Sequence, residues 1–547
     1  MNYYNLPFFL SSTAFFSNYW VHSLFSIPTL LLIPFQWRNN EPSKTIEYFS
    51  TLAPSSPTQN VLGSYTQLFP KTLQQVYIGV DVWGRSCHGG DGFGLYRSID
   101  HILPSGSGLS VALFGPGWTW EKLEEKGPSF TWDKWWEWET SLWVGPATGI
   151  LGVDIQIPEL KLKPNEPPCQ HGPFQPIASY IAKKTPPDPA DAPFHTTFCP
   201  GTGTKWFVEG REVFESANGW TDVDKQTSLG DMLWPRPELS REDGREDEIP
   251  STSTSFNFSD AWNGGSSLSI GMHSPATADQ APVAYWLPIQ SLTVTPRREY
   301  QASIVCKVTS SELGEPMLFL SLRSLPGSQP CPIDIVDGSF EDTRNGNVWK
   351  KLTIDFNVDV ARSDNAAQVK VCIGLMISSS KPIDASIILG QLNVSAPFPP
   401  SHMDYNVLIP WVDHQPSTTP PNSPFSGTLT WEVSIRFPEM ALIDMVQPEN
   451  PKPAWNTQPT DNWFPSYFNI YAQAFVDGHM GNGVDQAVTW IGTSKAGWSG
   501  RQQAFMVFQE NLPFLMPVSK IRFYVQGVTD FGEVMNLEKC AFIDVSA

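Results

Sequence analysis

Residues Val76–Gly84 read VYIGVDVWG, a nearly continuous apolar run that ends in polar and glycine residues. Such a run is typical of a parallel strand that is covered on both faces. A second run, LSVALFGPGW at Leu109–Trp118, follows after a polar stretch. Strands that alternate with helices indicate βα units, and the loops after such strands carry the active sites of barrels.

The rest of the chain has a different pattern. After residue 198, short alternating runs such as KKLTIDFNVDV and AQVKVCIGLMI are separated by Gly, Pro, Asn and Asp, a rhythm typical of β-sandwiches. Two proline clusters divide the chain. We therefore expect α/β structure followed by all-β structure, in four parts: an α/β part at 1–160, a proline-rich linker at 161–197, a β-sandwich accessory domain at 198–400 and a second β-sandwich domain at 401–547.

The composition excludes some classes of partner. The 547 residues carry a net charge of −20, which would repel phosphate backbones, so we expect no nucleic-acid partner. The 22 tryptophans are too many for core filling alone and suggest flat apolar ligands such as sugar rings.

Cysteine usage gives a prediction about metals and about the compartment. The seven cysteines are an odd number, without a C-x-x-C pair, which indicates free thiols in a reducing compartment. Cys87 and His88 are neighbours, but they lack a second pair at ligand spacing. We predict no structural zinc and no cofactor.

The N-terminal 37 residues contain no Lys, Arg, Asp or Glu. The length of this run is adequate for a bilayer, but Pro28, Pro34 and His22 interrupt it. We do not expect a membrane partner. A membrane-anchored protein, held through residues 7–36, stays open as an alternative.

Several motifs occur together in one order. VYIGVDVWGR is followed by GGDGF and then by SVALFGPGWTWE at Ser110–Glu121, and DAWNGGSSLSI stands at Asp260–Ile270. The opening pattern consists of the first methionine followed by asparagines and aromatic residues: Met1, Asn2, Asn5, Phe8, Phe9, Phe15, Phe16, Asn18 and Tyr19. With these motifs the chain resembles glycoside hydrolase family 85, the cytosolic endo-β-N-acetylglucosaminidases, as an N-terminally truncated fungal-type member.

The resemblance implies a fold and an activity. Residues 1–160 would be the C-terminal part of a TIM (β/α)8 barrel, with about the last three strands. The activity would be hydrolysis between the two N-acetylglucosamines of an N-glycan core, by a substrate-assisted retaining mechanism. The substrates would be N-glycans or glycopeptides, high-mannose type among them, and the location cytoplasmic.

The chain departs from the family's pattern at its start. The family's catalytic Asn-x-Glu pair lies on an earlier strand, which the resemblance puts upstream of Met1. We therefore expect no catalytic residue here and no hydrolysis by the chain as written. Deleting residues 21–36 would join Trp20 to Trp37 and restore the family's pattern, so we interpret this segment as a retained-intron insert in a gene model.

Aromatic residues near the predicted strand ends are the candidate sugar-binding side chains, since indole faces stack on pyranose rings. These are Trp83, Trp118 and Trp120, together with Tyr19, Trp20 and Trp37. For each tryptophan, packing in the core is the alternative. Asp81 and Arg85 are expected to support these side chains, and a structural salt bridge between them and a contact with a sugar hydroxyl are equal interpretations. Glu121 could pass for a general acid, but we expect it to support the site or the start of a helix.

One more function class stays open. A non-catalytic carbohydrate-binding β-sandwich protein would need only the C-terminal domains and their aromatic side chains. Its candidate binding residues are Trp262, Tyr285, Trp286, Trp431 and Trp463.

Overall fold

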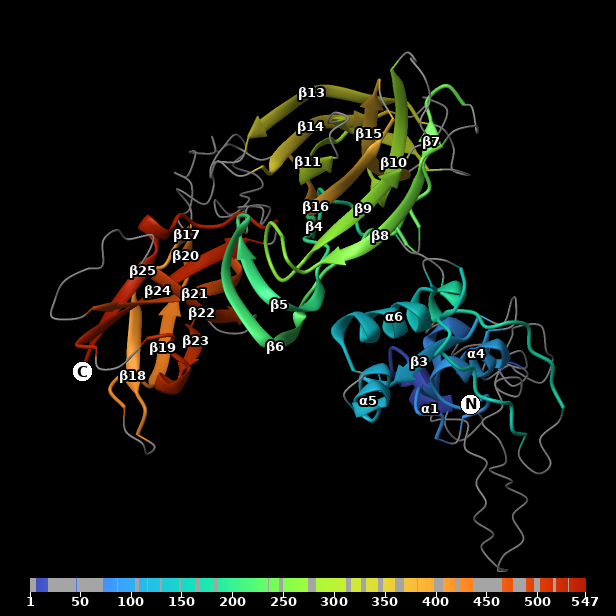
Figure 1. Ribbon diagram of the computed structural model, residues 1–547, viewed down its shortest axis with the longest axis horizontal. Helices are drawn as coiled ribbons and strands as arrows, with labels where there is room; N and C mark the ends of the chain where they lie inside the picture. Colours follow the sequence, from blue (N-terminus) through green and yellow to red (C-terminus); the bar gives the residue numbers. More distant parts are fainter. Residues whose placement is uncertain are drawn as a thin grey trace, which may run out of the picture. The chain divides into compact units, whose positions relative to one another are not determined.

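The computed structural model forms two compact units, Met1–Lys183 and Lys184–Ala547 (Figure 1). The residues that it describes are 6–17, 46, 72–85, 87–103, 108–115, 117–127, 130–146, 149–162, 168–181, 185–234, 236–244, 249–273, 282–310, 316–325, 331–342, 348–359, 368–380, 382–397, 407–418, 423–435, 465–475, 488–495, 502–514, 518–529 and 531–547.

A parallel sheet forms the centre of the first unit. Its strands, in spatial order, are β1 (Phe15–Ser17), β2 (Val76–Asp81) and β3 (Ser110–Phe114). Both pairings are parallel, with Phe15 opposite Val76 and Tyr77 opposite Ser110. Tyr77 is the only exposed residue of β2, which explains why that strand reads as an almost unbroken apolar run.

Short helices connect and cover these strands. They are α1 (Leu6–Ser11), η1 (Leu73–Gln75), η2 (Gly92–Gly94), α4 (Tyr96–Ile102), α5 (Trp118–Glu124), α6 (Trp132–Trp143) and η4 (Ile177–Tyr180). The α6 helix begins after Thr131, whose hydroxyl accepts the backbone N–H of Lys134, as an N-cap residue does. Helix and strand side chains share one core, to which Ile177 also contributes.

Two antiparallel sheets around one hydrophobic core make up the first part of the second unit. One sheet contains β7 (Ser240–Arg241), β10 (Val283–Val294), β12 (Met317–Ser324) and β15 (Val369–Ser379). The other contains β4 (Phe194–Thr196), β8 (Ser251–Asn257), β9 (Ser267–His273), β11 (Glu299–Ser310), β13 (Ile333–Asp342), β14 (Lys350–Val358) and β16 (Asp384–Ser395). Leu287 and Ile373 from one sheet and Ile304 and Ile387 from the other belong to this core.

A buried carboxylate ties the segment before β4 to this core. Asp188 is 3% exposed and accepts hydrogen bonds from the Tyr300 hydroxyl at 3.0 Å and from the Thr295 hydroxyl at 2.5 Å. A buried charge needs such partners, since it has lost its water. The second half of the proline-rich segment is therefore held by side chains of the second unit.

Further strands complete the second unit. The hairpin β5 (Pro200–Val208) and β6 (Arg211–Gln226) is antiparallel. The remaining strands are β17 (Val407–Leu408), β18 (Val412–Pro416), β19 (Gly427–Glu432), β20 (Ser434–Ile435), β21 (Pro465–Phe475), β22 (Val488–Lys495), β23 (Gln502–Val507), β24 (Lys520–Thr529) and β25 (Ala541–Ser546), with η6 (Gln509–Asn511) and η7 (Leu537–Lys539) between them. A second core, with Leu429, Trp431, Phe468 and Phe523, lies among these strands.

The predicted succession of α/β and then β structure is confirmed by these elements. The assignment of the first sheet to a barrel, of the rest to two sandwiches and the four-part division of the chain stay predictions. The segment 21–36 lies outside the described residues. In the part of the chain that is described, none of the helices has both the length and the apolar character needed to cross a membrane.

Candidate functional site

The carboxyl ends of β2 and β3 carry a polar and aromatic group of side chains. Asp81 ends β2 and is 1% exposed. Its Oδ2 accepts a hydrogen bond from Nε of Arg85 at 2.7 Å, and its Oδ1 accepts the backbone N–H of Trp83 at 3.1 Å. Of the two interpretations of this pair, the structure shows the salt bridge, and the bridge shapes the loop after β2.

Trp83 is held in place from several sides. Its Nε1–H donates a hydrogen bond to Oε2 of Glu121, in the first turn of α5, at 3.0 Å. The guanidinium carbon of Arg85 lies 5.5 Å from the indole centroid, and the Phe114 ring centroid lies 6.3 Å from it. Arg85, Phe114 and Glu121 are exposed and Trp83 is half-buried, so this group borders the solvent.

Gly115 provides the space that the indole occupies. Its φ is +97°, a conformation that glycine adopts without the strain a Cβ brings. A Cβ at this position would lie 1.6 Å from the Trp83 ring. The close approach of ring and backbone therefore requires glycine here.

Trp118 lies in the core, which corrects its candidacy as a sugar platform. It is 5% exposed, and its ring stacks on Trp138 at 6.2 Å with an interplanar angle of 24°. The Phe93 ring meets it edge-on at 6.0 Å. Trp118, the first residue of α5, belongs to the hydrophobic core that contains the strands of the sheet. We therefore assign it a role in core packing.

Trp120 is half-buried on α5 and faces α6 rather than Trp83. Its ring makes edge contacts with Phe130 at 4.7 Å and with Trp135 at 5.3 Å. The structure therefore brings Trp83 together with Asp81, Arg85 and Glu121. Tyr19, Trp20 and Trp37 lie outside the described residues.

The aromatic side chains named for a separate binding module are not at an open surface. Trp262, Tyr285, Trp286 and Trp431 are all buried, the last with 0% exposure, because they pack in the cores of the second unit. Trp463 lies outside the described residues. The sequence pattern alone does not distinguish a buried tryptophan from an exposed one, so this candidacy is corrected for the four described residues.

Glu139 is a carboxyl group that sequence reasoning missed. It lies on α6 and accepts a hydrogen bond from the Thr119 hydroxyl, which in turn accepts the indole N–H of Trp135 at 3.1 Å. Burial raises the pKa of Glu139 from its ordinary value of 4.5 to about 7. Nothing in the local pattern marks it, since α6 carries other acidic residues at polar positions.

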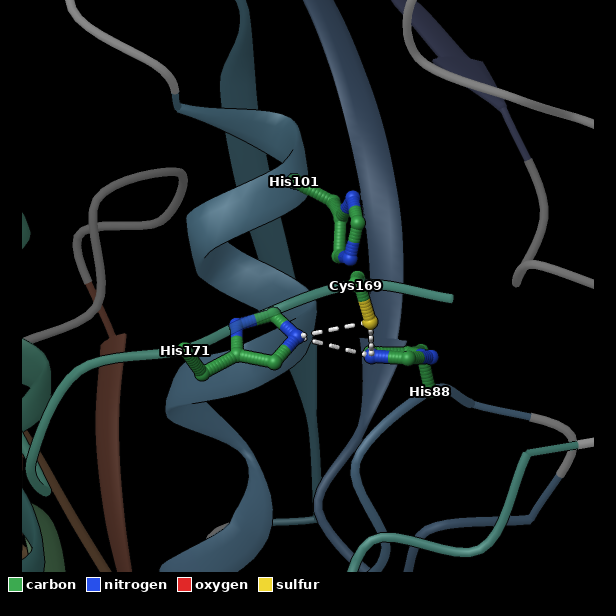
Figure 2. Close-up of side chains that lie close together, drawn as sticks. All are labelled: His88, His101, Cys169 and His171. Atoms are coloured by element: carbon green, nitrogen blue, oxygen red, sulfur yellow. Dashed lines mark hydrogen bonds between the residues drawn. The ribbon is translucent and has the colours of Figure 1, made fainter. Parts of the chain in front are cut away.

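Among the described residues, one group has the composition of a metal site. His88, His101, Cys169 and His171 offer ligand atoms that lie within 4.8 Å of one another (Figure 2). The prediction of no zinc considered Cys87 and His88 by themselves, whereas the tertiary structure joins His88 to residues far along the chain. The geometry of this group is argued below.

Comparison with known proteins first identifies a class. The family model described as glycosyl hydrolase family 85 matches residues 1–206. This segment contains the parallel sheet and the group around Trp83. The N-terminal part of the chain is therefore similar to glycoside hydrolases.

Two similar proteins carry the name of one enzyme type. Cytosolic endo-beta-N-acetylglucosaminidase of Gallus gallus is 29% identical over 195 residues, which cover 36% of this chain and 19% of the relative. The enzyme of the same name from Mus musculus is 27% identical over 211 residues, covering 39% and 22%. The motif-based resemblance to family 85 is thereby confirmed over the N-terminal part, and the match spans about a fifth of each relative's length.

A solved structure is also similar. The glycoside hydrolase domain of Endo-D from Streptococcus pneumoniae R6 aligns with a TM-score of 0.47 and 14% sequence identity, covering 88% of this chain and 60% of that chain.

Proposed function

We propose that the group at the carboxyl ends of β2 and β3 binds a sugar ring of an N-glycan. The observation that carries this proposal is the fixed, half-buried indole of Trp83, bordered by the exposed side chains of Arg85 and Glu121. Indole faces stack on the apolar faces of pyranose rings, and charged groups beside them bind hydroxyls. A rigid ring also loses little entropy when the ligand binds.

The relatives support the choice of ligand. Both are named as endo-β-N-acetylglucosaminidases. The match to the family model, residues 1–206, includes the segment with Trp83. We infer that the chain is a glycoside hydrolase of this kind, with N-glycans, high-mannose type included, as its ligands. The substrate-assisted retaining mechanism and the inactivity of the 547-residue chain stay predictions.

The fold supports a finer proposal about the first unit. Three parallel strands, with helix α4 between the second and the third and the polar side chains of Asp81 and Arg85 at the carboxyl end of the second, fit the pattern of a (β/α)8 barrel. We propose that this sheet is the last part of such a barrel and that the second unit comprises two β-sandwiches.

We also propose a cytoplasmic location. The relatives are named as cytosolic, and none of the seven cysteines, all of them among the described residues, forms a disulfide. Free thiols suit a reducing compartment.

A binding measurement with a Trp83 variant tests the proposed site. We expect Trp83→Ala to weaken the binding of a high-mannose N-glycopeptide to the full chain by about 10-fold, which corresponds to about 1.4 kcal/mol, because the stacking face is lost. Isothermal titration calorimetry gives the dissociation constant. Trp411→Ala, which removes an exposed indole of the second unit, is the matched control.

Equal affinities of Trp83→Ala and the unchanged chain would refute the sugar contact. The same preparations, incubated with the glycopeptide and followed by mass spectrometry, test the expected inactivity. Release of glycan at a rate well above a blank would contradict that expectation while leaving the binding site intact.

A further inference from the structure

Four side chains from three separate segments of the first unit converge on one point (Figure 2). His88 lies in the loop after β2, His101 on α4, and Cys169 and His171 in the segment that leads to η4. We propose that these four residues bind one Zn²⁺ ion as a closed, structural site. The proposal concerns the architecture of the unit and does not depend on the proposed glycan binding.

The distances among three of the ligand atoms fit a zinc site. Nε2 of His88 and Nε2 of His171 are 3.0 Å apart, and Sγ of Cys169 lies 3.4 Å from the first and 3.2 Å from the second. With Zn–N bonds of about 2.0 Å and Zn–S bonds of about 2.3 Å, tetrahedral geometry separates neighbouring ligand atoms by about 3.3 to 3.6 Å. The three atoms thus form one face of a tetrahedron that needs only a small expansion to hold the ion.

His101 offers the fourth ligand atom, which lies within 4.8 Å of the other three and would move closer to bind the ion. Its ring centroid lies 4.7 Å from that of His88 and 5.1 Å from that of His171, with both pairs of rings close to perpendicular. Figure 2 shows its ring next to Cys169, above it in that view. Three imidazoles and a thiolate are soft and borderline ligands that favour zinc over magnesium or calcium. Four protein ligands leave no open position, which is typical of structural rather than catalytic zinc.

A carboxylate behind His171 prepares that ring for a metal. Nδ1 of His171 lies 2.8 Å from Oδ2 of Asp100, and the Tyr180 hydroxyl donates to Oδ1 of the same carboxylate at 2.6 Å. Burial raises the pKa of Tyr180, so its hydroxyl keeps its proton. When Nε2 of His171 binds the ion, the ring keeps its proton on Nδ1, and Oδ2 of Asp100 lies in position to accept it. This carboxylate–histidine arrangement is the usual support of a zinc ligand.

Helix α4 also fixes the backbone on both sides of the cluster. The Ser98 hydroxyl, which is buried, donates to the carbonyl oxygen of His88. The Tyr96 hydroxyl donates to the carbonyl oxygen of Gly172 at 3.1 Å. The loop with His88 and the segment with His171 are therefore both anchored to the helix that carries His101, and the ligands are held ready for the ion.

A thiol–imidazole hydrogen-bond network is the competing explanation. Such a network would join His88, Cys169 and His171 in pairs, but it does not call for the ligand atom of a third histidine within 4.8 Å of them. A single cation accounts for all four at once. Binding would form a Zn–S bond and release the Cys169 thiol proton to solvent, with no change of oxidation state. The ion would then cross-link the loop after β2, α4 and the segment before η4.

Metal analysis of the purified full chain is the first test. We expect about one zinc per chain by inductively coupled plasma mass spectrometry. After removal of zinc by a chelator under reducing conditions, added Co²⁺ should produce the absorption bands of a tetrahedral site with a thiolate-to-cobalt charge-transfer band. Thermal unfolding of the first unit should occur at a lower temperature without zinc than with it.

Variants distinguish the ion from the hydrogen-bond network. Cys169→Ser keeps a hydroxyl for hydrogen bonding but should abolish the charge-transfer band, whereas Cys331→Ser, which changes a half-buried free cysteine of the second unit, should retain it. Asp100→Asn should keep the band and weaken zinc affinity by about 10- to 100-fold, because it alters only the support of His171.

Three outcomes would overturn the proposal: no zinc in the purified chain together with no cobalt band, a band that survives in Cys169→Ser, or binding of another metal in preference to zinc. If Cys169→Ser fails to fold, the cobalt titration of the unchanged chain decides the question.

Discussion

Single residues show how burial separates side chains that are chemically alike. Trp83 and Trp118 both follow a predicted strand, yet the first borders solvent beside Glu121 and the second packs on Trp138. Their neighbours along the chain do not reveal this difference. The same holds for Glu139, whose environment is set by Thr119 on another helix.

Glu139 should make the stability of the first unit depend on pH. Its pKa is raised to about 7 when folded, so the folded state binds more protons than the unfolded state between pH 4.5 and 7. The free energy of unfolding should therefore be highest below this window, fall as the pH rises through it and level off above it. We expect a loss of about 2 kcal/mol, measured by urea denaturation at pH 5 and pH 8.

Glu139→Gln should remove this contribution, because the amide does not titrate. Glu124→Gln, which changes an exposed carboxyl on α5, should leave the pH dependence as it is. An unchanged pH dependence in Glu139→Gln would show that other groups cause it.

At the scale of elements, the end of β3 is shaped by the indole that lies against it. Gly115 follows β3 with a positive φ, and the Trp83 ring occupies the space of a Cβ. A local sequence of FGPG predicts a turn but does not show which side chain packs on it. The strand end and the loop after β2 are therefore coupled through one contact.

Gly115→Ala should destabilise the first unit by about 2 kcal/mol, since it adds backbone strain and displaces the Trp83 ring. Thermal unfolding with tryptophan fluorescence measures the change. Gly117→Ala is the control, because a Cβ there would meet nothing within 4 Å. It should cost less, about 0.5 to 1 kcal/mol, since Gly117 is the N-cap residue of α5 and alanine caps less well than glycine. Equal effects of the two substitutions would contradict the role of the ring contact.

At the scale of the whole molecule, each compact unit has a hydrophobic core of its own. The core of the first unit joins α1, the parallel strands and η4, while the sheets of the second unit surround separate cores. The division falls at Lys183, and Asp188 is held by Tyr300 and Thr295 of the second unit.

Residues 184–547 should therefore fold without the first unit. Expressed as a separate chain, this fragment should be soluble and should unfold cooperatively, at a temperature within a few degrees of the matching transition of the full chain. Differential scanning calorimetry compares the two. A fragment that starts at residue 198 lacks Asp188 and β4, so it should be less stable. Failure of 184–547 to unfold cooperatively would show that it requires the first unit.

The sequence by itself determined the strands and the succession of α/β and β structure, because apolar runs and their periods are local properties of the chain. The motifs also sufficed for the resemblance to family 85, since they lie within short segments. Only the tertiary structure decided which tryptophan borders solvent, how Glu139 is buried, and that His88 meets Cys169 and His171. These features depend on contacts between residues far apart in the sequence, which no local pattern encodes.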